Sequence, residues 1–319
     1  MGTGLKIAAF GAAVAATFGA AYGIGKGVGP LGDDAQPTHA AAPHKEPDPG
    51  SRTAASPAGG LQMSEAGYTL ALDTPRVSPG ERTALRFSIK DAQGRKVTAY
   101  EREHEKELHF IVASRDLTVF RHLHPTRAAD GTWSTTADLP AAGGYRAFAD
   151  FKPAKKGAQP LTLGADLAVS GTSTPQPLPA PSRTAKVDGY EVTLTGALKP
   201  NKSDTLTLKV SRNGKPVTDL QPYLGAYGHL VALRSGDLAY LHVHPHGTPG
   251  DGTTRPGPEV AFSATAPSPG TYRLFLDFRH EGTVRTAAFT VETGTSTQPQ
   301  EPTPAAPGHD DTHGTTDQH

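Results

Sequence analysis

The sequence contains no cysteine among its 319 residues. This absence excludes disulfide bonds, zinc–thiolate sites and cysteine nucleophiles together. Methionine is scarce, with 2 residues, and there is only 1 tryptophan. The chain also lacks a net charge, since 31 Lys and Arg residues balance 31 Asp and Glu residues. Without a basic excess or a basic face, the composition is not that of a nucleic-acid-binding protein.

An uncharged segment rich in Ala and Gly lies between Lys6 and Lys26. Its length is at the border between a signal-peptide core and a membrane-spanning helix. We expect residues 1–29 to form a signal anchor, a transmembrane helix that is retained rather than cleaved. The positive N-terminus would stay inside, which leaves the rest of the chain outside the cytoplasmic membrane. A cleaved signal peptide would instead release a secreted protein.

Changes in composition divide the remaining chain into five segments. Residues 30–62 are rich in Pro, Gly, Ala and Asp and predict a disordered tether. Short apolar strands separated by turn residues fill residues 63–171 and again residues 186–293, a pattern typical of β-sandwiches. A Pro-rich linker, residues 172–185, joins them, and residues 294–319 predict a disordered tail that contains histidine. The fold prediction is therefore all-β, with two tandem immunoglobulin-like β-sandwich domains.

The two predicted domains share a sequence pattern that repeats after about 120 residues, a period that suits tandem domains rather than a solenoid. Predicted strands of the first domain are Tyr68–Leu72, Thr83–Ile89, Leu108–Ala113 and Tyr145–Phe151. Segments that echo them in the second are Tyr190–Val192, Leu208–Val210 and Tyr272–Phe278.

A motif with three histidines occurs once in each domain, and the spacing is the same in both. Its histidines are His109, His122 and His124, then His229, His242 and His244. Two-residue turns at Arg115–Asp116 and Ser235–Gly236 would place the first two histidines of each trio directly opposite each other. The third lies two residues further along the strand and therefore on the same face. Because histidine is the commonest side-chain metal ligand, we predict one metal site in each domain.

A closed metal site needs a fourth donor, and the sequence offers several. In the first domain the candidates are His104 and Glu107, which lies opposite His124 in the same register. In the second domain the candidates are His246 and His280.

Asp150 and Asp277 stand inside otherwise apolar strands, where an unpartnered carboxylate is costly to bury. Each either orients a histidine or binds the metal directly. Alternatively, each faces solvent on an edge strand or bonds a buried Tyr or Arg. The face that carries the histidines also carries Ile111 and Phe120, and the opposite face is apolar too. The pattern alone does not decide which face points into the core.

The hairpin resembles that of exported bacterial β-sandwich proteins, in particular YtkA-like and CopC-like immunoglobulin-type modules. The resemblance rests on Leu108-His109, Asp116-Leu117, His124-Pro125 and the later strand Tyr145–Phe151, together with their second copies. It implies a role in envelope copper handling. The chain departs from CopC-like proteins because it has no Met-rich ligand set and no evident mature N-terminal histidine, which argues against a Cu(I) site.

Imidazole and carboxylate ligands suit Cu(II) and Zn(II). We therefore predict an extracytoplasmic protein that buffers or delivers a divalent metal, copper or zinc, and is not an enzyme. Its expected partners are the metal, the cytoplasmic membrane through residues 1–29, and another envelope metal-handling protein, but no nucleic acid. The alternative is a non-catalytic cell-surface or adhesion-type repeat protein in which the histidines are structural.

Overall fold

The computed structural model describes residues 58–241 and 243–293. Within them the chain forms β-strands and no helix, so the described part has no helix that could cross a membrane. The all-β prediction is confirmed. The predicted signal anchor, most of the tether, the tail and His242 lie outside the described residues.

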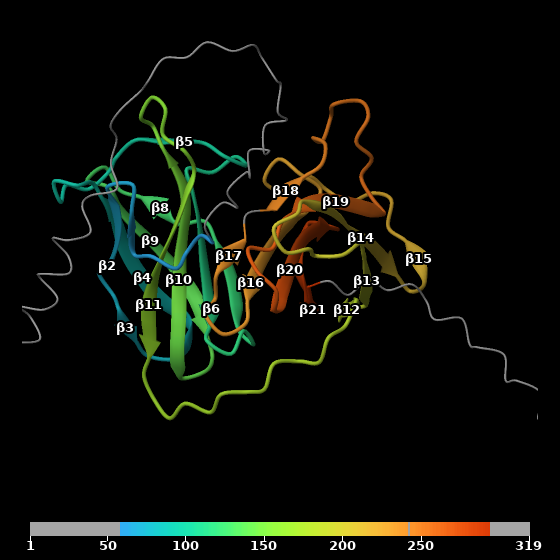
Figure 1. The fold of residues 1–319 in the computed structure, drawn as a ribbon, viewed down its shortest axis with the longest axis horizontal. Helices are drawn as coiled ribbons and strands as arrows, with labels where there is room; N and C mark the ends of the chain where they lie inside the picture. The colour runs from blue at the N-terminus through green and yellow to red at the C-terminus, as the bar shows by residue number, and fades with distance from the viewer. Residues whose placement is uncertain (1–57, 242, 294–319) are drawn as a thin grey trace, which may run out of the picture. The chain divides into compact units, whose positions relative to one another are not determined.

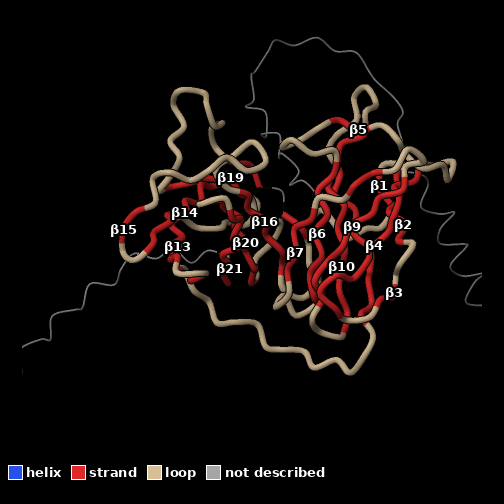
Figure 2. The backbone as a smooth tube through the Cα atoms, turned by 180° about the vertical axis from the view of Figure 1, so that it is seen from behind, coloured by secondary structure: helices blue, strands red, loops and turns tan. Residues whose placement is uncertain are grey.

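Strands β1 to β11 form two sheets, which together we name the first repeat (Figures 1 and 2). One sheet has the order β1-β2-β4-β9-β8 and contains β1 (Ser64–Glu65), β2 (Tyr68–Leu72), β4 (Gly80–Lys90), β9 (Thr132–Leu139) and β8 (Thr126–Arg127). The other has the order β3-β11-β10-β6-β7, with β5 beside β10, and contains β3 (Arg76–Val77), β11 (Leu161–Val169), β10 (Gly143–Pro153), β6 (Leu108–Ser114), β7 (Phe120–Leu123) and β5 (Tyr100–Glu101).

Strands β12 to β21 form two further sheets, which we name the second repeat (Figure 1). The first has the order β12-β13-β14-β19-β18, with β15 beside β14, and contains β12 (Thr184–Val187), β13 (Tyr190–Thr195), β14 (Asp204–Arg212), β19 (Glu259–Ala264), β18 (Val243–Pro245) and β15 (Lys215–Pro216). The second has the order β17-β16-β20-β21 and contains β17 (Tyr240–Leu241), β16 (His229–Arg234), β20 (Thr271–His280) and β21 (Thr283–Glu292). The described residues of both repeats belong to one compact unit.

The predicted register of the two histidine hairpins is wrong by two residues. Ile111 pairs with His122, and Ala232 pairs with Leu241, so the first two histidines of a trio are not directly opposite. The reason is a longer loop: the Ser114 amide donates to the carbonyl of Val119, and the Arg234 amide donates to that of Ala239. A shift of two keeps every side chain on its predicted face, because side chains alternate with a period of two.

Each repeat has its own apolar core between its two sheets. Phe110 and Val112 of β6 point into the first core, and Leu230 and Ala232 of β16 point into the second. Phe87 and Phe110 stack in the first core with ring centroids 4.1 Å apart. Burial of such side chains stabilises each repeat by roughly 1.5–3 kcal/mol per residue.

A third apolar cluster, which we name the junction, lies between the repeats. The alternate residues of β6 and β16 point into it, so these strands are buried on both faces. Its members are Ile111, Ala113, Leu117, Phe120, Phe148, Val231, Leu233, Leu238, Tyr240 and Phe275. This explains the apolar residues on both faces of the histidine hairpin: one face belongs to a core and the other to the junction.

Equivalent residues exchange partners across the junction. Phe120 stacks on Phe275 with ring centroids 4.0 Å apart, and its counterpart Tyr240 contacts Phe148, the counterpart of Phe275, at 5.7 Å. Each repeat therefore presents the same aromatic pair to the other.

Residues 58–62, which the sequence assigns to the tether, are hydrogen bonded to both repeats. Gly59 and Tyr240 form a reciprocal pair of backbone hydrogen bonds, and the Gly60 amide donates to the carbonyl of Thr162. A Cβ on Gly164 would lie 2.0 Å from the carbonyl oxygen of Gly60, so only glycine permits this approach.

Candidate metal centre

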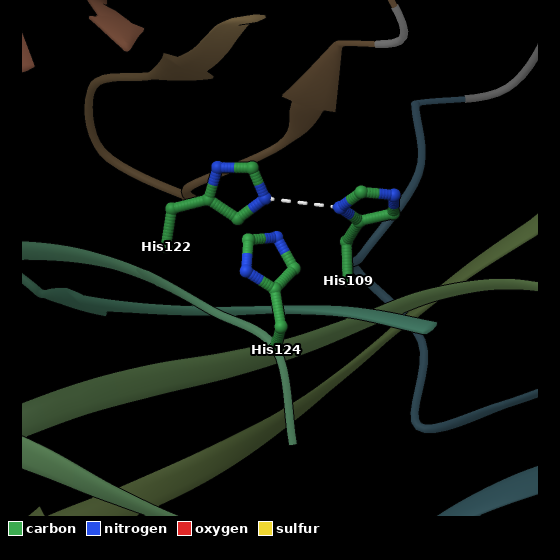
Figure 3. A group of neighbouring side chains, drawn as sticks. All are labelled: His109, His122 and His124. Carbon is green, nitrogen blue, oxygen red and sulfur yellow. Dashed lines mark hydrogen bonds between the residues drawn. The ribbon is translucent and has the colours of Figure 1, made fainter. Parts of the chain in front are cut away.

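Three histidines of the first repeat converge at the end of the junction (Figure 3). His109 lies on β6, His122 on β7 and His124 just after β7. One ring nitrogen from each lies within 4.8 Å of the other two. His109 and His122 share the face of Ile111 and Phe120, so the cluster belongs to the junction rather than to the first core.

The proton of the His109 ring is held by a backbone carbonyl. The Nε2 atom lies 3.2 Å from the oxygen of Glu103, and a carbonyl can only accept a hydrogen bond. Burial, with a contribution from neighbouring imidazoles, lowers the pKa of His109 to about 2. The ring is therefore neutral, with its proton on Nε2 and a lone pair on Nδ1.

The His122 ring is oriented by a carboxylate of the second repeat. Its Nδ1 donates to Oδ2 of Asp277 at 2.8 Å, and both side chains are at least 95% buried, with 5% and 4% exposed. Asp277 also accepts a 2.6 Å hydrogen bond from Thr286. With Nδ1 committed to Asp277, the lone pair of a neutral His122 is on Nε2.

The two remaining ring nitrogens face each other. His109 Nδ1 and His122 Nε2 are 3.1 Å apart and form a hydrogen bond when the His122 ring carries a second proton (Figure 3). In a neutral His122 ring, both of these nitrogens carry a lone pair. Two lone pairs at this distance repel unless a cation lies between them, either a proton or a metal ion. Nitrogens bound to one tetrahedral zinc ion at about 2.0–2.1 Å are about 3.3 Å apart, so the observed separation fits a shared metal.

His124 adds a buried nitrogen without a partner. Its Nε2 atom has no hydrogen bond among the described residues, which is costly for a buried polar atom. The His124 ring centroid lies 4.9 Å from that of His122 and 5.3 Å from that of His109. Burial, with His122 and Lys106 adding to it, lowers the pKa of His124 to about 3, so this ring is also neutral.

The corresponding residues of the second repeat do not form an equivalent trio in the described structure. His229 is buried, and its ring centroid lies 6.0 Å from that of His109 in the first repeat. His244 is exposed on β18, which pairs with β19 in the other sheet. His242 lies outside the described residues.

Most predicted fourth donors are engaged elsewhere. Glu107 accepts from the Arg127 guanidinium at 3.1 and 3.3 Å, and it is not opposite His124. His246 is exposed and lies 2.7 Å from the hydroxyl of Ser263.

Two further candidates, His280 and Asp150, have different surroundings. Both nitrogens of His280 are occupied, by the hydroxyl of Tyr190 at 2.7 Å and the carboxylate of Asp219 at 3.0 Å. Asp150 accepts a 2.9 Å hydrogen bond from Thr162, as its counterpart Asp277 does from Thr286.

The sequence pattern missed the contribution of the second repeat to this cluster. Asp277 orients a histidine, but one of the first repeat rather than its own neighbour His229 on β16. Tyr223 was not singled out, yet its ring centroid lies 6.1 Å from His124 and 6.0 Å from His229. The one signal that could have indicated these contacts is the apolar character of both faces of the histidine strands.

Fold and site together define an all-β protein with a duplicated pair of sheets and a histidine cluster at their junction. The chain belongs to the family described as a domain of unknown function, DUF8832, whose sequence model matches residues 63–163 and again residues 185–295. The match thus occurs once in each repeat. No curated protein matches the chain.

The solved structures that are similar to this chain match it with low sequence identity and low TM-scores. The Escherichia coli adhesin FdeC is 17% identical, with a TM-score of 0.21, over 71% of this chain and 64% of that one. Yersinia pseudotuberculosis InvD is 12% identical, with a TM-score of 0.23, over 76% and 62%. A tetra-tandem repeat from the extending region of a large adhesion protein is 13% identical, with a TM-score of 0.24, over 70% and 48%. The matched regions thus span less than two thirds of each of these structures.

Proposed function

We propose that the protein binds one divalent metal ion through His109, His122 and His124, and that it holds or delivers this ion rather than catalysing a reaction. The observation that carries the proposal is the pair of facing ring nitrogens, His109 Nδ1 and His122 Nε2, whose other nitrogens are already committed as donors. A metal ion removes the repulsion between their lone pairs and also gives the buried Nε2 of His124 a partner.

The donor set favours Cu(II) or Zn(II). All three donors are imidazoles, which suit these ions, and the chain has no thiolate that would select a softer ion. The carboxylate of Asp277 behind His122 is the arrangement that commonly fixes the tautomer of a metal-binding histidine. With an extracytoplasmic location, as expected from residues 1–29, the protein would serve as an envelope metal carrier.

The test is calorimetric titration of the untagged chain with Zn(II) and Cu(II), compared between two variants. His124→Gln removes a ligand nitrogen, and we expect it to weaken the tightest site by more than about 100-fold, beyond the loss usual for an orienting residue. His244→Gln is the matched control, because it changes the counterpart residue in the exposed β18 strand. Equal binding by both variants would refute the proposal.

A second candidate function is a non-catalytic surface repeat protein with structural histidines. This function is favoured if a proton, rather than a metal ion, lies between His109 Nδ1 and His122 Nε2. His122 would then be positively charged and would form a buried ion pair with Asp277. In this case neither metal raises the melting temperature, whereas a bound metal raises it in proportion to the logarithm of its concentration.

A further inference from the structure

A three-histidine site leaves one position of a tetrahedral metal ion open. Within the first repeat, Glu107 is held by Arg127 and cannot fill it without breaking that ion pair. Asp277 reaches the cluster but is committed to His122 and Thr286. The open position is therefore filled either by water or by a side chain that approaches the trio from another direction.

His229 of the second repeat approaches two members of the trio. Its ring centroid lies 6.0 Å from that of His109 and 6.2 Å from that of His122. Centroids of His109 and His122 are 5.3 Å apart, and the nitrogens of His229 lie outside the group that converges within 4.8 Å, so coordination requires the His229 ring to move toward the trio.

The tautomer of His229 suits a ligand. Its Nε2 donates to the carbonyl of Leu224 at 3.0 Å, so a neutral ring has its lone pair on Nδ1. His109 is fixed in the same way by the carbonyl of Glu103, in the equivalent turn of the first repeat. The two turns therefore hold one histidine from each repeat with its Nδ1 free of the proton.

We propose, on the basis of the proposed function, that His229 is the fourth ligand and that the metal is shared between the repeats. The ion then fastens the first repeat to the second at the end of the junction, where the Asp277–His122 bond already crosses. Metal binding and the closed arrangement of the repeats are consequently linked, since the complete ligand set exists only when the junction is formed.

His104 is the rival donor, because its ring centroid lies 5.1 Å from that of His229 and 6.1 Å from that of His109. It is exposed, and among the trio it approaches only His109. A side chain that is free in solvent loses more conformational entropy on binding than a buried one, so His229 is the better candidate.

The test uses zinc and the full chain, and compares His229→Gln with His104→Gln. The absence of cysteine allows two spin labels to be attached at Lys156→Cys and Lys215→Cys, one exposed site in each repeat. One equivalent of zinc should narrow the distance distribution between the labels in the parent chain and in His104→Gln. In His229→Gln, zinc affinity should fall by at least about 10-fold and the narrowing should be lost.

Unchanged affinity in His229→Gln, or weaker binding with the zinc-dependent narrowing intact, would overturn the shared site while leaving the proposed function standing. Absence of zinc binding by the parent chain would instead overturn the proposed function. If His229→Gln does not fold, ¹⁵N spectra of the histidine rings in the parent chain decide the question. A zinc-induced shift of the assigned His229 Nδ1 that matches those of the trio supports the shared site, and an unshifted His229 Nδ1 overturns it.

Discussion

The two histidine hairpins have nearly the same sequence, but their strands leave the sheet at different points. In the first repeat, β7 remains paired with β6 as far as Leu123, and the chain joins the other sheet only at Thr126. In the second repeat, β17 ends at Leu241, and Val243 already pairs with Ala264 of the other sheet. The chain therefore crosses to the other sheet after His124 in the first repeat, but before His244 in the second.

Because of this difference, the equivalent residues His124 and His244 lie in different surroundings. His124 stays beside His122 at the junction, and its buried Nε2 has no hydrogen-bond partner among residues 58–241 and 243–293. His244 is carried to the other sheet and is exposed to solvent. A duplicated motif therefore does not guarantee a duplicated site, because a crossing only a few residues earlier moves a ligand to another surface.

The largest expected effect is a loss of stability when the apolar junction between the repeats is disrupted. Phe120→Ala and its counterpart Tyr240→Ala each empty the junction of one large ring, and each should lower the free energy of unfolding by about 3–5 kcal/mol. Urea unfolding can be followed by the fluorescence of Trp133, which is buried in the first repeat. If Tyr240→Ala in the second repeat moves the Trp133 transition to a lower urea concentration, the two repeats unfold together.

The control for this pair is Val284→Ala. Because Val284 is 39% exposed, this substitution should change the free energy of unfolding by less than about 0.5 kcal/mol. If Tyr240→Ala leaves the transition at Trp133 unchanged, the junction does not couple the two repeats.

An intermediate effect is expected at the carboxylate that crosses the junction. Asp277→Asn keeps an acceptor for His122 but removes the charge, and should weaken zinc binding by about 10–100-fold. The measurement is competition with a chelator of known affinity. Asp219→Asn is the control, because it changes an exposed carboxylate that contacts His280 rather than the trio. Equal affinities of the two variants would contradict an orienting role for Asp277.

The metal-free protein should also lose stability as the pH falls. Burial lowers the pKa of His109 to about 2, of His124 to about 3 and of His229 to about 4, whereas unfolded histidine titrates near 6.5. Between about pH 6.5 and 4 the unfolded chain binds protons that the folded chain does not. The free energy of unfolding should therefore fall as the pH falls, by about 1.4 kcal/mol per pH unit and histidine.

Urea unfolding in the presence of a chelator, at pH 7.5, 6.0 and 5.0, measures this slope. His124→Gln should reduce this slope, because it removes one of the three histidines whose pKa is lowered in the folded chain. A slope that is the same in the variant, or a protein that is more stable at pH 5.0 than at pH 7.5, would contradict the neutral, buried state of these rings.

Strands were the most predictable part of the molecule. The segment Tyr68–Leu72 is β2 with the same bounds, and Leu108–Ala113 and Tyr145–Phe151 lie within β6 and β10. Alternating apolar residues and Gly- or Pro-containing turns define such segments locally. The convergence of the trio was also predicted, because His122 and His124 are two residues apart and a register error of two residues leaves His109 on their face.

The register, the crossing and the junction depend on contacts that are distant in sequence. Leu117 and Leu238 adopt positive φ angles of 58° and 61° in the hairpin loops and are buried in the junction, which a two-residue turn would not allow. Only the packed structure shows that Ile111 and Val231 face the other repeat. For the same reason, the contact of Asp277 with His122 could not be predicted from the neighbours of Asp277 on its own strand.

The exchange of Phe120 and Tyr240 between equivalent partners is the contact pattern of a symmetric homodimer, in which one patch binds a second copy of itself. Here the two subunits are covalently joined, so one of them can change without its twin. One chain with two repeats can hold a single asymmetric centre, with three histidines from one repeat and the Asp277 carboxylate from the other, whereas two identical subunits would build that centre twice.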